Sequence, residues 1–259
     1  KEAWLPSAGN AALALSAYCA RAGIKCNVYL PSSAKEKVVD ECKLYGARVK
    51  VVDGFLSDAA MRMYDEIEGE SVGVLTTFRE PGRVEGKKTI AFEIESDLSA
   101  DWIIFPTGGG TGIVALWKAY SEMEQLGWLR GARPRLVLVQ SEGCAPLVRA
   151  FERGETRAEV WKDPHTIASG INVASSRADF LILNAIYESD GYAIAVSDES
   201  IVENLRLSAK LEGINFSPEG AATVAGLRKL AEQVEIGHLD RIVIVNTASG
   251  VRYNIPSNW

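Results

Sequence analysis

Four glycines and a threonine follow an apolar segment of the chain, in the order Gly108, Gly109, Gly110, Thr111 and Gly112. Because glycine lacks a Cβ atom, the main chain of such a loop can approach an anion and turn several N–H groups toward it. The residues after the loop have helical apolar spacing, and a helix N-terminus favours a negative charge. The loop has neither the Lys-Ser/Thr pair of a Walker sequence nor G-x-G-x-x-G spacing. A tight turn would explain one or two of these glycines, so the full run favours a phosphate-binding loop.

A second polar turn, formed by Ser7, Ala8, Gly9 and Asn10, lies between an apolar run and a predicted helix. Serine and asparagine are common helix caps, because their side-chain oxygens accept hydrogen bonds from the first N–H groups of the helix. The motif alone therefore favours a capped turn. The functional alternative is that these N–H groups bind a carboxylate, while the Asn10 amide donates to an oxygen of a ring-shaped cofactor.

A third polar turn contains Thr247, Ser249 and Gly250, and it follows the last apolar run of the chain. An α/β fold binds its ligands at this end of its strands, so the hydroxyl groups could contact a ligand nitrogen. The same residue types also form ordinary turns. The motif gains weight because it accompanies the other two.

The chain alternates short apolar runs with longer stretches of helical periodicity, which predicts an α/β fold with parallel strands. Two of the helices are predicted at 10–22 and 34–45. The irregular stretch 78–88 is rich in basic residues and predicts a lobe boundary, with a smaller lobe at 1–84 and a larger one at 85–259. The predicted strands are 3–6, 26–31, 48–52, 73–76, 102–107, 135–140, 192–196 and 241–247.

The composition argues against several classes of partner. The net charge is −6 and the basic residues are scattered, so the chain offers no field that would attract nucleic acid. No stretch approaches the roughly 20 apolar residues of a membrane span. The first residues do not read as a secretory signal. We therefore expect a cytoplasmic protein without nucleic-acid or membrane partners.

The cysteines and histidines do not suggest metal, redox or serine-hydrolase chemistry. The four cysteines form no C-x-x-C pair and have no histidine at ligand spacing, so we expect buried free thiols and no metal site. The two histidines, His165 and His238, are not near a G-x-S-x-G sequence.

Taken in order, the three motifs resemble the cofactor-binding frame of the fold type II pyridoxal-phosphate enzymes, the tryptophan-synthase β family. Within that family, residues 84–94 resemble the R-x-E-G-x-K-T-x-x-F-E-I stretch of threonine synthases, and residues 217–222 resemble their P-E-G-A-A segment. The resemblance covers nearly the whole chain. It implies two lobes of mostly parallel, twisted sheet with flanking helices, with pyridoxal 5′-phosphate between them, and a homodimer.

The resemblance also implies roles for individual residues. Asn10 would donate to the ring oxygen of the cofactor, and the turn from Ser7 through Ala8 and Gly9 would receive the substrate carboxylate. The loop 108–112 would bind the cofactor phosphate. Thr247 would face the pyridine nitrogen, with Ser249 as the alternative if the register shifts by two. A hydroxyl at this nitrogen leaves the ring a weaker electron sink than a carboxylate would.

The implied reaction converts O-phosphohomoserine and water to threonine and phosphate. A phosphorylated substrate needs fixed cations, and Arg83 and Lys88 match the basic positions of the family pattern. Arg79 and Lys87 belong to the same basic run and are better explained as a solvated basic face.

Two departures from the family pattern affect these expectations. The chain has Phe78 and Glu80 where threonine synthases have small polar residues and N-P-Y-R, which leaves the exact substrate open. The family carries its cofactor-linked lysine on a helix before the Ser-Ala-Gly-Asn turn, whereas only six residues precede this turn here. We therefore nominate no catalytic lysine in this chain. We expect that lysine upstream of Lys1, in the N-terminal segment of the larger lobe, and we expect the chain to be inactive without it.

Two alternatives to this reaction remain open at this stage. One is a serine/threonine dehydratase or a β-replacing enzyme of the same fold, also acting on a small amino acid. The other is a non-catalytic sensor of a phosphate-bearing ligand.

Overall fold

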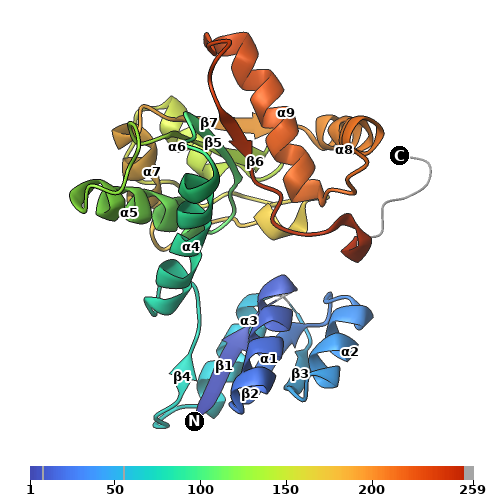
Figure 1. Cartoon of the computed structure of the whole chain (residues 1–259). Helices are drawn as coiled ribbons and strands as arrows, with labels where there is room; N and C mark the ends of the chain where they lie inside the picture. Colours follow the sequence, from blue (N-terminus) through green and yellow to red (C-terminus); the bar gives the residue numbers. More distant parts are fainter. Residues whose placement is uncertain (8, 55, 254–259) are drawn as a thin grey trace. The chain divides into compact units, whose positions relative to one another are not determined.

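The computed structural model describes residues 1–7, 9–54 and 56–253. The chain divides into two compact units, Lys1–Arg83 and Val84–Trp259. Figure 1 colours the first unit in blue to teal and the second from green to red. The predicted boundary after residue 84 differs from this division by one residue.

The first unit is built on a parallel sheet in the order β3-β2-β1-β4. The central strand β2 is buried on both faces, because helices cover each side. Val28 and Leu30 pack with Ala12 of α1, whereas Tyr29 points to the other face and packs with Met63 of α3. The elements are β1 (Glu2–Pro6), α1 (Asn10–Ala22), β2 (Lys25–Pro31), α2 (Glu36–Leu44), β3 (Arg48–Val52), α3 (Leu56–Glu66) and β4 (Gly73–Val74).

The second unit has a parallel sheet in the order β7-β6-β5-β8. Its strands and helices are α4 (Gly82–Asp97), β5 (Trp102–Pro106), α5 (Thr111–Gln125), β6 (Arg135–Ser141), α6 (Pro146–Glu152), α7 (Asp179–Glu188), β7 (Tyr192–Val196), α8 (Asp198–Glu212), α9 (Pro218–Gln233) and β8 (Ile242–Ile244). Two short 3₁₀ helices, η1 (Ser169–Ile171) and η2 (Gly250–Arg252), follow α6 and β8.

Each face of this second sheet carries its own hydrophobic core. Alternate residues of β5 divide between the faces, as a strand requires. Ile103 packs with residues of α5, α6 and α7, and Ile104 packs with residues of α8 and α9. Figure 1 shows the two groups of helices on opposite sides of the sheet. This double cover leaves the ends of the strands as the place where loops can form a site.

The predicted α/β class with two mostly parallel sheets is confirmed, and each predicted strand corresponds to an observed one. Two edge strands are shorter than predicted: β4 ends at Val74 and β8 ends at Ile244. Each has one neighbouring strand and pairs with only part of it. The predicted helix at 34–45 is observed as α2, which begins two residues later.

The cysteines are free and buried, as predicted. Burial raises the pKa of Cys26 to about 12 and raises the pKa of Cys144, so both thiols stay protonated near neutral pH. Within the described ranges, no group of three or more His, Cys, Asp and Glu residues could hold a metal ion. Over the same ranges, no helix is both long and apolar enough to cross a membrane.

We expect Asp179→Asn to lower the free energy of unfolding at pH 7 by about 1–3 kcal/mol. The Asp179 carboxylate accepts hydrogen bonds from the Ala158 N–H at 2.8 Å, the Arg157 guanidinium at 2.9 Å and the Phe180 N–H at 2.8 Å. Burial raises the pKa of Asp179, but these hydrogen bonds outweigh burial and hold the pKa below its ordinary value. The stabilisation is therefore present above the unfolded pKa of about 4 and is lost as the pH falls through the lower folded pKa.

Denaturant unfolding of both proteins at several pH values measures this difference. The exposed residue Asp97 provides the control, and Asp97→Asn should leave stability nearly unchanged. A difference between Asp179→Asn and the parent that persists undiminished at strongly acidic pH would contradict the expectation.

Candidate functional site

The glycine loop connects the carboxyl end of β5 to the N-terminus of α5 and packs closely against its surroundings. A Cβ atom on Gly108 would lie 2.8 Å from Val173 Cγ2 and 2.9 Å from the Gly170 carbonyl oxygen. A Cβ atom on Gly110 would overlap Ile182, and one on Gly112 would overlap the Phe105 ring. Gly110 also has φ 81°, a conformation that favours glycine. Close packing therefore accounts for three of these glycines, whatever the loop binds.

The main chain of the loop is oriented by Ser176, whose hydroxyl donates to the Gly109 carbonyl oxygen at 2.9 Å. Because a trans peptide unit is planar, the N–H of Gly110 points in the opposite direction from that carbonyl. The N-cap residue of α5, Gly110, has no side-chain capping hydrogen bond, and the first turn of α5 contains no acidic residue. This arrangement of backbone N–H groups at a helix N-terminus suits a phosphate.

Lys87 brings a positive charge to the same helix N-terminus, since its Nζ donates to Thr111 Oγ1 at 2.8 Å. Lys88 lies elsewhere and forms ion pairs with Glu85 and Glu122, each at 2.6 Å. Hydrogen bonds from Lys88 to these two carboxylates raise its pKa. The structure thus brings to the glycine loop the lysine that the sequence interpretation had assigned to a solvated face.

The third motif lies beside the N-terminus of α9. Asn246 Oδ1 accepts hydrogen bonds from the Ser217 N–H at 3.3 Å and the Ser217 hydroxyl at 3.2 Å. Ser249 forms a bridge with Phe216 and accepts a hydrogen bond from the Val251 N–H at 3.5 Å. Because Ser249 Oγ accepts in that contact, its hydroxyl proton can be donated to a ligand. Both Thr247 and Ser249 are exposed.

In the first unit, the polar turn has the form of a strand-to-helix connection. Ser7 is buried and its Oγ accepts a hydrogen bond from the Gly9 N–H at 3.3 Å. Helix α1 begins at Asn10 as predicted, and its N-cap residue Gly9 has no side-chain capping hydrogen bond. Asn10 is exposed. Ala8, the remaining nominated residue of this turn, lies outside the described residues.

Arg83 forms hydrogen bonds with two residues that shortly precede it in the chain, Thr77 and Glu80. Its guanidinium donates to Thr77 Oγ1 at 2.8 Å, and its backbone N–H donates to Glu80 Oε1 at 3.1 Å. Burial lowers the pKa of Arg83, and the nearby Glu80 carboxylate opposes that shift. The group remains a cation at neutral pH. The neighbouring Arg79 instead lies over the Tyr64 ring, 4.6 Å from its centroid.

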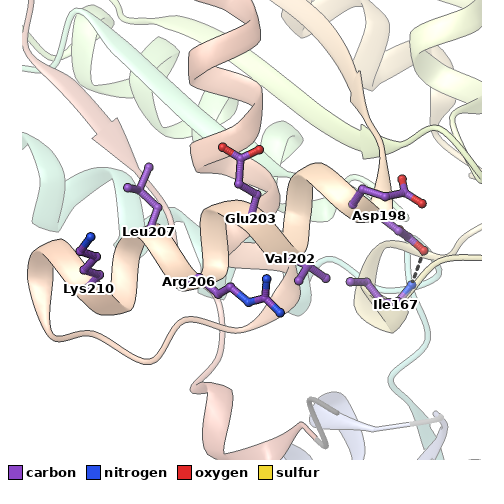
Figure 2. Close-up of a pocket in the computed structure, with 8 residues that line it drawn as sticks. Ile167, Asp198, Val202, Glu203, Arg206, Leu207 and Lys210 are labelled. Carbon is purple, nitrogen blue, oxygen red and sulfur yellow. Dashed lines mark hydrogen bonds between the residues drawn. The ribbon is translucent and has the colours of Figure 1, made fainter. Parts of the chain in front are cut away.

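A cavity of about 680 Å³ lies on α8, and Figure 2 shows the side chains that line it. Val202, Glu203, Arg206 and Lys210 are among them, and Asp198 accepts the Ile167 N–H at the rim. Among the nominated residues that the structure describes, none lines this cavity. The glycine loop is the better candidate for the reaction site, because it combines backbone donors, a helix N-terminus and a lysine.

The glycine loop fits the phosphate of pyridoxal phosphate. The donors are backbone N–H groups, a hydroxyl and an ammonium group, and all of them suit an oxyanion. Side chains at Gly108 and Gly110 would clash with Val173 and Ile182, so glycine at these positions keeps the loop in this conformation. These features define the class as an α/β protein with a loop suited to an anion at the carboxyl end of a parallel sheet.

The model of the family described as "Pyridoxal-phosphate dependent enzyme" matches residues 3–248. The chain therefore belongs to the family of pyridoxal-phosphate-dependent enzymes. It is 39% identical over 251 residues to a threonine synthase of Methanocaldococcus jannaschii, and this match covers 95% of this chain and 61% of that protein. It is 35% identical to a threonine synthase of Methanosarcina acetivorans, covering 93% of this chain and 60% of that protein. The chain thus spans about three fifths of the length of these relatives.

Solved structures share the fold at lower sequence identity. The processed form of threonine deaminase isoform 2 from Solanum lycopersicum has a TM-score of 0.81 at 19% identity, and the match covers 99% of this chain and 70% of that one. A serine racemase from Dictyostelium discoideum has a TM-score of 0.79 at 21% identity, and the match covers 98% of this chain and 77% of that one. These similarities confirm the fold expected from the three sequence motifs.

Proposed function

We propose that the complete protein converts O-phosphohomoserine and water to threonine and phosphate, with pyridoxal phosphate as cofactor. The observation that carries this proposal is the 39% identity, over 95% of the chain, to a protein described as threonine synthase. The related basic stretch supplies Arg83 as a cation for a phosphorylated substrate. When bound, pyridoxal phosphate withdraws electrons from the bonds at the Cα atom of an amino acid.

In this proposal, the chain contributes binding and orientation at both ends of the cofactor. The N–H groups of loop 108–112, the Thr111 hydroxyl and Lys87 bind the cofactor phosphate. Thr247, or Ser249, donates its hydroxyl hydrogen to the ring nitrogen, and so leaves that nitrogen without a full positive charge. Such a ring suits elimination and replacement reactions, which need less electron withdrawal than reactions that build up a full carbanion.

In the same proposal, the residues of the first unit bind the substrate and the ring oxygen of the cofactor. Ser7, Ala8 and Gly9 bind the substrate carboxylate at the N-terminus of α1, where the helix dipole favours an anion. Asn10 donates its side-chain amide to the ring oxygen of the cofactor. Arg83 binds the substrate phosphate and stabilises it as it leaves. Lys88 forms ion pairs with Glu85 and Glu122, so we assign it the lesser role of adding positive charge for the substrate phosphate.

The reaction is tested with the full-length protein and two substrates. We expect release of phosphate and formation of threonine from O-phosphohomoserine, with little 2-oxobutanoate from threonine. The reverse result would support the dehydratase alternative. Binding of pyridoxal phosphate without turnover of either substrate would support the sensor alternative.

We also propose that the protein is a homodimer in the cytoplasm, by analogy with the family. Light scattering of the full-length protein in solution tests the first statement, and cell fractionation tests the second.

We expect Lys87→Met to raise the Kd for pyridoxal phosphate about tenfold or more, because it removes a charge-assisted donor of the phosphate site. Lys88→Met is the matched control: it removes the same charge from the adjacent position, where the lysine pairs with Glu85 and Glu122. Equilibrium dialysis of the cofactor against each variant measures the Kd. A larger effect from the Lys88 change than from the Lys87 change would place the phosphate elsewhere.

A further inference from the structure

Glu219, the second residue of α9, is a buried carboxylate with only one of its oxygens paired. The residue is 3% exposed. Its Oε1 accepts a hydrogen bond from the Gly170 N–H at 2.6 Å. Its Oε2 is buried and has no hydrogen-bond partner among the described residues. An acid at a helix N-terminus is ordinary, but a buried oxygen without a partner costs free energy, so helix capping alone does not explain this residue.

The residue that Glu219 holds, Gly170, supports the glycine loop. The Gly170 carbonyl oxygen and Ile171 Cα lie 2.9 Å and 3.1 Å from the position that a Cβ atom on Gly108 would occupy. The backbone of η1 is therefore in direct contact with the start of the loop. Because the hydrogen bond from Gly170 to Glu219 is short, at 2.6 Å, it fixes the position of this contact.

The neighbours of Glu219 in the first turn of α9 contact Asn246, the residue before the Thr247 turn. Ser217 donates to Asn246 through both its N–H and its hydroxyl, and a Cβ atom on Gly220 would overlap the Asn246 side chain. Asn246 directly precedes Thr247. The first turn of α9 thus contacts the glycine loop through η1 on one side and the Thr247 turn on the other.

We propose that Glu219 is a positioning residue, which sets the place of the glycine loop relative to the Thr247 turn and so determines how strongly the loop binds a phosphate. The proposal rests on the phosphate-binding role of the loop under the proposed function. It assigns no contact between Glu219 and the ligand. Its specific consequence is that loss of the Gly170 hydrogen bond weakens binding of the phosphate and leaves binding of the ring unchanged.

The test compares pyridoxal phosphate with pyridoxal, which lacks the phosphate, on the full-length protein freed of cofactor. In Glu219→Leu, we expect the Kd for pyridoxal phosphate to rise about tenfold or more, while the Kd for pyridoxal changes less than about twofold. Glu219→Gln keeps a side-chain oxygen that can accept the Gly170 N–H, so it should retain the preference for the phosphorylated ligand. Equilibrium dialysis provides both constants for each variant.

Glu95→Leu is the matched control, since Glu95 is also buried and accepts hydrogen bonds from the Ser99 hydroxyl and the Arg130 N–H. It should lower the melting temperature without changing the ratio of the two constants. If Glu219→Leu does not fold, Gly170→Ala tests the same contact, because its Cβ atom would lie 2.8 Å from Glu219 Oε1. The expected result is again a loss specific to the phosphorylated ligand.

If Glu219→Leu and Gly170→Ala weaken binding of both ligands equally, the ratio of the two dissociation constants is unchanged, and the proposal is overturned. A different failure belongs to the proposed function: if the parent protein binds pyridoxal as tightly as pyridoxal phosphate, the glycine loop does not bind the phosphate. The parent protein therefore separates the two failures before any variant is compared.

Discussion

A Gly109→Asp variant of the full-length protein is expected to purify without pyridoxal phosphate. The loop places backbone N–H groups, the Thr111 hydroxyl and the Lys87 ammonium group at the N-terminus of α5. A carboxylate on residue 109 would occupy or repel the space of the phosphate, and two like charges about 4 Å apart repel by several kcal/mol near a protein surface. Cofactor content, measured by absorbance after denaturation and release, should fall below detection.

The control for this prediction is Gly131→Asp, which adds the same charge at an exposed glycine whose Cβ position has no atom within 4 Å. This variant should retain its cofactor. Gly109→Ala separates size from charge, and we expect a smaller loss from it because Gly109 is only half-buried. Normal cofactor content in Gly109→Asp would show that the phosphate does not bind at this loop.

The strand–loop–helix units could be predicted from the sequence because their signals are local. The apolar run that becomes β5, the glycines after it and the helical spacing after Thr111 are contiguous, and parallel strands direct their carboxyl ends to one edge. The beginning of α1 at Asn10 could be predicted from local signals in the same way. The lengths of β4 and β8 could not be predicted, because each pairs with only part of its one neighbouring strand, and the extent of that pairing leaves no local sequence pattern.

The roles of Lys87 and Lys88 could not be separated from the sequence. Adjacent residues on a helix point about 100° apart, so only the rotation of α4 about its axis decides which lysine faces the loop. The apolar residues around 84–89 are too few to fix that rotation. The ion pair of Lys88 with Glu122 joins α4 to α5, and such a long-range contact leaves no local pattern.

The role of Glu219 could not be predicted from the sequence, because it also depends on a long-range contact. From the sequence, residues 217–222 are recognised only by their resemblance to the P-E-G-A-A segment. In the structure these residues begin α9, and the Ser217 hydroxyl caps it by accepting the Gly220 N–H. The hydrogen bond to Gly170 spans 49 residues. A Pro-Glu-Gly helix start predicts an exposed acid near the helix dipole, so burial of this carboxylate could be recognised only once η1 and α9 were seen together.

The second large effect is expected at Arg83, where Arg83→Ala should raise the KM for O-phosphohomoserine by about a hundredfold and leave the Kd for pyridoxal phosphate within about twofold. The reason is that the guanidinium would bind the phosphate of the substrate and not that of the cofactor. Thr77 already orients the guanidinium by accepting a hydrogen bond at 2.8 Å, so little ordering is needed when substrate binds. Steady-state kinetics and equilibrium dialysis supply the two constants.

Arg79→Ala is the control that separates a specific contact from the loss of a positive charge. It removes a guanidinium from the same basic run, but one that lies over the Tyr64 ring. We expect it to change KM only slightly. Arg83→Lys should lie between Arg83→Ala and the parent, because an ammonium group keeps the charge and loses the two-pronged geometry. If Arg83→Ala weakened cofactor binding as much as substrate binding, or if Arg79→Ala had the same effect on KM, Arg83 would serve to hold its own segment through Thr77 and Glu80, and the substrate phosphate would need another cation.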